Sequence, residues 1–319
     1  KTFTTKADLT KVTQVHSGDD LIAVLNAAKE GDYIAIMDNA EYIIYAEGDE
    51  DKTYTLDKSL TISGYYSSNR PTIKGGITIA AAIKSLELSN VIFKGEDKAG
   101  GLLIMGTSPA EIETCKINGC DISNYKNSII SNETKVNIGT ITIQNSIANN
   151  IGRDVIDIRG GKLKSIEVSA CTFNNTARTF LRNNSDAIAT VSFIQCTFYK
   201  TCHLDNKDNN GLFLMDKTTD NSELIVKQCL FSNIGIEKLG DNKYVGTWTR
   251  NDKMKASETY ADNYYYDSPN LWTNSKYAKD HAKVATEKDP QFANAANGDF
   301  TVGNKDLAGN EIGDPRWIK

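Results

Sequence analysis

One short pattern recurs along this chain and limits the folds that it can adopt. It is clearest at 166–175, where the sequence is Ile-Glu-Val-Ser-Ala-Cys-Thr-Phe-Asn-Asn. Related segments are found at 115–124, 141–150, 191–198 and 224–233. Apolar and polar residues alternate within each segment, as in a strand with one buried face. A strand unit repeated at a period of roughly 25 residues predicts a solenoid, in which every repeat forms one coil and stacks on the next.

The alternation changes phase once within the repeat, which indicates a bend in each coil. Val168 lies on one strand face, whereas Cys171 and Phe173 are an odd step away and belong to the opposite face. A corner near Ala170 brings all three side chains into the interior. We expect Asn175 to continue the inward phase after Phe173, with its amide bonded to the backbone of a second corner.

The cysteines follow the same repeat. The chain has six cysteines, and their spacing matches neither a metal-ligand pattern nor the disulfide framework of a small secreted protein. We therefore expect those at equivalent inward positions to be small buried hydrophobic residues. These positions are Cys120, Cys171, Cys196 and Cys229.

The length and net charge of the chain limit the classes of protein to which it can belong. The chain has 319 residues, a hydrophobic fraction of 39% and a net charge of −5. Length alone would permit two domains, but repeats over most of the chain favour one elongated domain. The mild acidity gives no basic surface for nucleic acid, and no apolar run reaches the roughly 18 residues of a membrane helix. An anionic glycan stays open as a partner, because it needs only a local basic patch.

We expect a single domain, 1–319, in three parts. A helix at 18–29, capped by Ser17 or Asp19, is predicted from its amphipathic pattern. Such a helix would cover the open end of the solenoid core. The parts are an N-terminal arm and capping helix at 1–30, regular coils at 31–233, and a long loop with closing coils at 234–319.

The chain resembles a known family at its beginning, in its coils and at its end. Gly-Asp-x-Ile-x-Ile at 31–36, the recurring corner Asn, and Asp-Pro-x-Phe at 289–292 with Gly-Asp-Phe at 298–300 resemble right-handed parallel β-helix proteins of the pectate lyase-like superfamily. The Gly-Asp-Pro-Arg-Trp segment at 313–317 is similar to that of secreted or surface glycan-utilisation proteins of gut bacteria. The resemblance implies an all-β fold, a single-stranded right-handed parallel β-helix with an N-terminal capping helix. It also implies a polysaccharide partner and a secreted or cell-surface location, with any export signal outside this chain. It does not decide activity, because the superfamily includes lyases, hydrolases and non-catalytic members.

The richest charged cluster lies on two consecutive repeats, at 153–159 and 178–184. If the apolar residues of these segments point inward, Asp157, Arg159 and Arg182 point outward. Asp157 and Arg182 occupy equivalent positions, so their backbones should be about 4.8 Å apart. The planar guanidinium of arginine suits carboxylates and sulfates, which predicts a site for an acidic sugar.

This cluster is similar to the active site of the chondroitinase B and alginate lyase family, which uses an acidic residue, a Lys, and an Arg on the next coil. Asp154 resembles the acidic position, Arg159 stands in place of the Lys, and Arg182 matches the Arg. Arg cannot act as a base in proteins, whereas a desolvated Lys can. Gly152 replaces the family's calcium-ligating acid, and Asn183 replaces its His. The resemblance therefore implies binding of an acidic sugar without the usual base or metal site.

An insertion after Lys200 makes one interval between repeats longer than its neighbours. We expect this insertion, at 200–210, to form a wall beside the charged cluster and to bring His203 to it. Asn-x-Asp-x-Asn-Gly at 206–211 has calcium-loop spacing, but Lys217 stands where the closing Glu should be. A turn is the expected interpretation, so we predict no cofactor, with calcium as the alternative.

Aromatic residues near the end of the chain are further candidates for contacts with sugar rings. They are Tyr264, Tyr265, Tyr266, Trp248 and Trp272. Alternation along the strand predicts that Tyr264 and Tyr266 belong to the core instead.

Three hypotheses follow for the function. The first is a monomeric secreted or surface protein that binds a polysaccharide, acidic in character. The second is a polysaccharide lyase with an atypical base, such as His203 or a Tyr. The third is a structural or adhesive β-helix, in which the charged cluster is an Asp–Arg ladder. The candidate binding residues are Asp154, Asp157, Arg159, Arg182 and His203.

Overall fold

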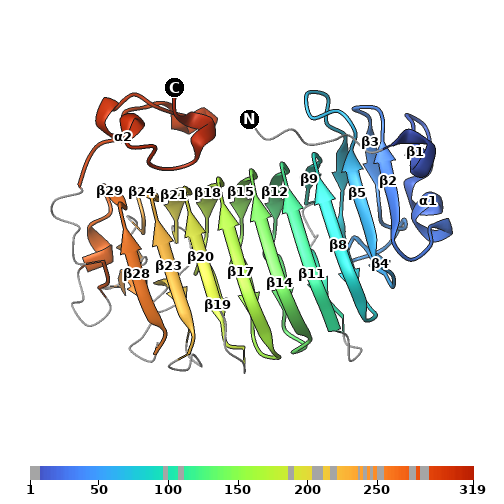
Figure 1. Cartoon of the computed structure of the whole chain (residues 1–319), viewed down its shortest axis with the longest axis horizontal. Helices are drawn as coiled ribbons and strands as arrows, with labels where there is room; N and C mark the ends of the chain where they lie inside the picture. Colours follow the sequence, from blue (N-terminus) through green and yellow to red (C-terminus); the bar gives the residue numbers. More distant parts are fainter. Residues whose placement is uncertain are drawn as a thin grey trace.

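The computed structural model is a right-handed parallel β-helix built from three parallel sheets that run along the molecule (Figure 1). Each coil contributes one strand to each sheet, as the repeat predicts. The structure describes residues 8–95, 100–106, 111–185, 190–202, 211–215, 221–235, 238–239, 243–244, 247–249, 255–272, 278–280 and 287–319.

We name the sheets A, B and C. The strands of sheet A are β1 (Thr13–Val15), β2 (Asp32–Ile36), β5 (Leu60–Gly64), β8 (Ile83–Ser89), β11 (Glu111–Asn118), β14 (Asn137–Gln144), β17 (Leu163–Ser169), β20 (Thr190–Ile194), β23 (Glu223–Lys227) and β28 (Ser257–Ala261). Those of sheet B are β3 (Glu41–Ile43), β6 (Thr72–Lys74), β9 (Ile92–Lys94), β12 (Asp121–Tyr125), β15 (Ile147–Ile151), β18 (Thr172–Thr176), β21 (Thr197–Thr201), β24 (Leu230–Ser232) and β29 (Tyr264–Tyr266). Those of sheet C are β4 (Thr53–Leu56), β7 (Gly76–Ile79), β10 (Gly101–Met105), β13 (Ser128–Asn132), β16 (Ile156–Ile158), β19 (Leu181–Asn183), β22 (Gly211–Leu214) and β27 (Thr247–Thr249).

Short elements complete the description. The helices and 3₁₀ turns are η1 (Leu9–Lys11), α1 (Leu21–Ala27), η2 (Pro269–Trp272), η4 (Ala295–Asn297), α2 (Lys305–Gly309) and η5 (Pro315–Trp317). Two antiparallel pairs are β25 (Lys238–Leu239) with β26 (Lys243–Tyr244), and β30 (Phe292–Asn294) with β31 (Asp299–Val302).

The register of the sheets confirms the repeat. Phe173 pairs with Ala148 on one side and Phe198 on the other. The Phe173 and Phe198 rings stack at 5.4 Å, and Phe198 stacks on Phe231 at 4.7 Å. All these side chains are buried. The phenylalanine column is therefore the spine of the core in these coils.

The cysteines also lie where the repeat places them. All six are buried and free of disulfides. Burial raises the pKa of Cys115, Cys120 and Cys171 to about 12. Because the thiolate is the reactive form, these residues act as core side chains.

The two corners of each coil are confirmed, but the direction of the corner Asn was wrong. Ala170 and Asn175 have φ of 52° and 53°, in the left-handed region that Asn tolerates. The amides of the Asn column lie outside, where Asn150 Nδ2 donates to Asn124 Oδ1 at 2.8 Å. The left-handed residue shifts the phase of the chain, so the following residue, Thr176, is the buried one.

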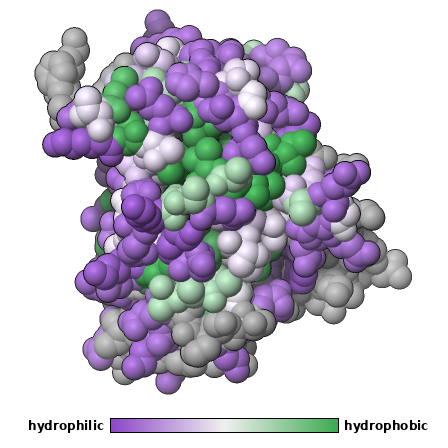
Figure 2. Space-filling model, turned by 90° about the vertical axis from the view of Figure 1, so that its right-hand side faces the viewer, coloured by the Kyte–Doolittle hydropathy of each residue, from purple (hydrophilic) through white to green (hydrophobic). Residues whose placement is uncertain are grey.

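The N-terminal end is covered by the predicted helix, α1, with Leu21 and Leu25 buried against the core. Its cap is Asp20, whose carboxylate accepts a hydrogen bond from the Ala23 amide at 3.1 Å, and not Ser17 or Asp19. Figure 2 shows this end of the molecule, where apolar residues near the centre are surrounded by hydrophilic ones. The strand β1 precedes α1 and already belongs to sheet A.

The C-terminal segment differs from the expected closing coils. After β29, the chain forms the antiparallel hairpin β30–β31, which lies outside the coils (Figure 1). The Tyr199 ring on the outer face of sheet B contacts the rings of Phe292 and Phe300, at 5.9 and 5.4 Å. Leu230 packs with Leu307 in a second, smaller core. Since outward apolar residues on β21 and β24 supply this surface, the segment 287–319 covers the side of the β-helix rather than its end.

Candidate functional site

The structure brings the predicted charged cluster together on sheet C. Asp157 of β16 pairs in register with Arg182 of β19, as expected. Arg159 Nε donates to Asp157 Oδ2 at 2.9 Å, and Arg159 Nη2 lies 2.7 Å from Glu133 Oε1. Arg182 Nε lies 3.8 Å from Asp157 Oδ1. Four of the five predicted binding residues therefore lie in or beside one ion-pair network.

The acidic members of the network are buried, which differs from the expectation of an exposed patch, whereas Arg159 and Arg182 are 26% and 24% exposed. The side chains of Asp154 and Asp157 are only 2% and 4% exposed. Asp154 lies within ion-pairing distance of Arg178 (3.6 Å) and Arg182 (3.9 Å), and burial raises its pKa. Asp157 lies against Arg159 and Arg182, the two arginines that were expected to bind ligand. His203 lies outside the described residues.

The aromatic candidates are mostly core residues. Tyr265 is the buried member of the Tyr run, and Tyr264 and Tyr266 are only partly buried, which reverses the prediction. The cause is register, because Tyr265 pairs with the inward Phe231. Trp248 is also fully buried, and Trp272 packs against Tyr265 with ring centroids 4.9 Å apart. Neither Trp248 nor Tyr265 can stack on a sugar.

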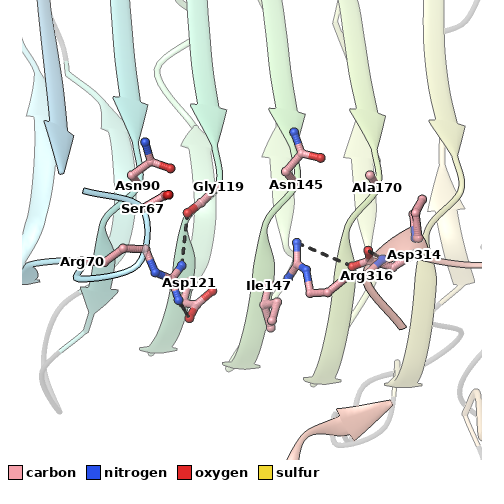
Figure 3. A pocket seen from close by; sticks show the side chains of 11 residues that line it. Ser67, Arg70, Asn90, Gly119, Asp121, Asn145, Ile147, Ala170, Asp314 and Arg316 are labelled. Carbon is pink, nitrogen blue, oxygen red and sulfur yellow. Dashed lines mark hydrogen bonds and ion pairs between the residues drawn. The ribbon is translucent and has the colours of Figure 1, made fainter. Parts of the chain in front are cut away.

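An open groove lies instead along the edge between sheets A and B (Figure 3). Its volume is about 600 Å³. We call it the corner groove. Corner residues of four consecutive coils form its floor, and two arginines stand at its sides. The floor is Asn90, Gly119, Asn145 and Ala170, and the arginines are Arg70 and Arg316. With adjacent strands about 4.8 Å apart, the floor is about 14 Å long.

The corner geometry explains the residues of the floor. Asn90, Gly119, Asn145 and Ala170 all have positive φ, between 49° and 66°. Gly and Asn adopt this conformation most readily. Asn145 Nδ2 also donates to Asn118 Oδ1 at 2.9 Å, which joins neighbouring coils. The requirement for a tight corner therefore places amide side chains along the groove.

Arg70 forms one side of the corner groove. It lies in the loop between β5 and β6, where its Nη1 donates to the carbonyl of Gly119 at 3.1 Å. Its Nη2 forms an ion pair with Asp121, which points outward from β12. These two contacts fix the guanidinium beside the floor (Figure 3).

Arg316 forms the other side and is held by the C-terminal segment. The Asp314 carboxylate accepts hydrogen bonds from Thr172 Oγ1 at 2.7 Å and from the Arg316 amide at 3.0 Å. Trp317 Nε1 donates to Thr172 Oγ1 at 2.8 Å. Arg316 Nη2 is 3.8 Å from Asp314 Oδ2, beyond hydrogen-bonding distance. Its guanidinium therefore keeps donors for a ligand in the groove, toward which it extends in Figure 3.

We predict a pH effect at Asp314. Burial is the main cause that raises the pKa of this carboxyl above its ordinary value of 3.8. The folded protein then binds the proton more tightly than the unfolded chain does, so protonation favours folding. The stability of the wild type relative to Asp314→Asn should therefore increase as pH falls from 7 through the raised folded pKa towards 3.8. Urea unfolding of both proteins between pH 7 and 4 measures this difference in stability. A wild type that becomes less stable relative to Asp314→Asn at low pH would contradict the prediction.

Sequence reasoning missed Arg70 and Asp121 and assigned no binding role to Asp314 or Arg316. One signal was present, because the change of phase at Ala170 marks the same corner in every coil. The contact of Asp314 with Thr172 joins positions 142 residues apart, and no repeat predicts it.

Two general features bear on the class of site. Within the ranges described, no cluster of three or more His, Cys, Asp or Glu side chains is arranged to hold a metal ion. No helix in the same part of the chain is long and apolar enough to cross a membrane.

The fold and groove define a parallel β-helix protein with an open surface groove. Two families match parts of this chain, and both are described as domains of unknown function: DUF4957 matches residues 47–179 and DUF5123 matches residues 166–317. Among solved structures, the chain is similar to the PL6 family alginate lyase AlyGC, with 13% identity and a TM-score of 0.47. The match covers 79% of this chain and 37% of that one. No curated protein matches the chain.

Proposed function

We propose that this protein binds an acidic polysaccharide in the corner groove. The observation that carries the proposal is an open groove across four coils, with Arg70 on one side and Arg316 on the other. A volume of about 600 Å³ is typical of a ligand site. Its floor runs along the stacking direction of the coils, with Arg70 near one end and Arg316 near the other, so a segment of a polymer can lie between the two arginines (Figure 3).

The chemistry of the lining supports a sugar ligand. Amides on the floor can donate to and accept from hydroxyl groups. Arginine forms charge-assisted, bidentate hydrogen bonds with carboxylates and sulfates. Arg70 and Arg316 are a quarter to a third exposed, with side-chain exposures of 25% and 29%. They are therefore accessible, and their contacts within the protein hold them in place.

The finer parts of the proposal rest on sequence motifs. We propose membership of the pectate lyase-like superfamily, a secreted or cell-surface location, and action as a monomer. The motifs at 31–36, 289–292 and 313–317 support the first two. In this proposal the cluster of Asp154, Asp157, Arg159 and Arg182 stabilises the coils beside the site, and binding is assigned to the corner groove.

Arg316→Ala should weaken binding of an acidic polysaccharide by about tenfold, because one charge-assisted contact is lost. Isothermal titration calorimetry with alginate, polygalacturonate and chondroitin sulfate measures the affinity. Lys319→Ala is the matched control, since it removes an exposed cation of the same segment that does not line the groove. The control should bind like the wild type.

Two results would overturn or extend this assignment. Equal affinity of Arg316→Ala and the wild type for a ligand that binds would exclude the corner groove. New ultraviolet absorbance from unsaturated uronate ends, on any of the three polymers, would assign lyase activity to the protein.

A further inference from the structure

A second groove lies at the opposite edge of sheet B, where that sheet meets sheet C. Its volume is about 480 Å³. We call it the lysine groove, because three lysines line it together with two amides of the Asn column. These residues are Lys74, Lys94, Lys126, Asn124 and Asn150.

The lysines are brought together by the register of the strands. Lys74 of β6 pairs with Lys94 of β9 on adjacent strands, and Lys126 directly follows β12. Lys74 forms an ion pair with Glu41 at 2.6 Å. Within the described ranges, Lys94 and Lys126 have no acidic side chain at ion-pairing distance. Among the described residues that line the groove, the charged side chains are all lysines, in a chain of net charge −5.

Two glycines also line this groove. Gly95 and Gly152 flank Lys126 on the neighbouring coils. A Cβ on Gly95 would lie 2.3 Å from the carbonyl oxygen of Asn124, and one on Gly152 would lie 2.4 Å from that of Lys126. Close coil stacking excludes a side chain at both positions, so these two residues add no side chain to the lining beside Lys126.

The arrangement of charges has an energetic cost in the free protein. Like charges on directly paired residues of neighbouring strands destabilise a sheet. Lys74 and Lys94 form such a pair, although the ion pair of Lys74 with Glu41 offsets part of the repulsion. An oxyanion between the lysines and the floor amides would reduce the remaining repulsion and accept hydrogen bonds from both kinds of donor.

The two grooves border the same open face of sheet B. Strand β12 contributes Asp121 at its start to the corner groove, and Tyr125 at its end to the lysine groove. These residues are four positions apart, which is about 13 Å along a strand. One oligosaccharide or a branched segment can therefore contact both grooves.

We infer that the lysine groove is a second subsite, which binds carboxylate or sulfate groups of the polysaccharide whose backbone lies in the corner groove. This inference rests on the proposed function and makes it more specific: the ligand is a polyanion that spans the outer face of β6, β9, β12 and β15. Lys94 and Lys126 are the residues that select the anionic groups.

The test is the double variant Lys94→Met with Lys126→Met, which keeps side-chain length and removes both charges. Its affinity should fall about tenfold or more, and its affinity should depend less on salt concentration than that of the wild type. Lys164→Met is the matched control, because Lys164 is an exposed strand lysine on sheet A. Circular dichroism and thermal unfolding establish that all variants are folded.

The ligands used as probes separate the two sources of oxyanion. Alginate carries only carboxylates, dextran sulfate carries sulfates, and unmodified dextran is the neutral control. If the double variant loses affinity for either polyanion, the result supports the lysine groove and identifies the group that it binds. Unchanged affinity of the double variant for both polyanions overturns it.

The two proposals fail in different ways. If Arg316→Ala loses affinity and the lysine variant does not, the corner groove is retained and the lysine groove is rejected. If only the lysine variant loses affinity, the ligand is bound at the lysine groove and the corner groove is rejected. Absence of binding to every acidic polymer tested rejects both.

Discussion

Replacing Asp157 by alanine is expected to lower the free energy of unfolding by about 3 kcal/mol. The Asp157 side chain is 4% exposed and lies against Arg159 and Arg182. Among the described ion pairs, removing this carboxylate leaves Arg159 with only the exposed Glu133 and Arg182 with only Asp154, at 3.9 Å. Uncompensated charges of this kind are the costly consequence of breaking a buried ion pair.

Urea denaturation measures this effect, and Glu133→Ala is the matched control. Glu133 contacts the same Arg159 at 2.7 Å, but its side chain is 50% exposed. Water replaces an exposed partner at little cost. The free energy of unfolding of the control should therefore fall by less than about 1 kcal/mol. Similar losses for the two variants would contradict the assignment of burial as the cause.

The same variant also separates structure from binding at this cluster. If the charged cluster stabilises the coils, Asp157→Ala should keep its affinity for a polysaccharide at temperatures where it is folded. A loss of affinity without a loss of stability would return the cluster to the role of ligand site that the sequence predicts.

Phe198→Ala is expected to lower the free energy of unfolding by about 4 kcal/mol. The Phe198 ring is fully buried and stacks between Phe173 and Phe231. It also contacts Phe180 edge-on, with ring centroids 4.9 Å apart. Alanine would leave a cavity in a rigid column of rings. Phe198→Leu is the control and should lower the free energy of unfolding by about 1.5 kcal/mol or less, because leucine fills more of the cavity that alanine would leave.

The effect of Phe198→Ala should also reach the corner groove. In a solenoid each coil depends on its immediate neighbours. Phe198 lies between Thr197 and Tyr199, and both of these outward residues hold the C-terminal segment. Hydrogen exchange at 299–317 should therefore be faster in the variant. Unchanged exchange there, together with reduced stability, would show that the segment is anchored independently of this coil.

The repeat in the sequence was sufficient to predict the coils and much of their interior. Alternation and a single change of phase placed Val168, Cys171 and Phe173 inside, and the spacing placed Asp157 beside Arg182. These predictions succeed because strand periodicity and coil stacking are local rules that act on each repeat in the same way.

The sequence could not determine burial on the outer surface. Asp157 points away from the core, as predicted, yet arginines of the same coil and of a neighbouring coil lie against it and it is buried. Whether an outward side chain meets water depends on the conformations of long side chains around it, which have no period. The outward direction of Asn175 was decided by a left-handed backbone conformation, which alternation does not encode.

The corner groove needed the tertiary structure most. The sequence determined its floor, because each coil must turn and Asn or Gly favours that turn. Its sides come from Arg70 and from Arg316, which lie far apart in the chain and outside the repeat. Arg316 reaches the groove because outward apolar residues of β21 and β24 bind the hairpin β30–β31. Long-range packing of that kind depends on the completed surface of the β-helix, so only the folded chain could decide it.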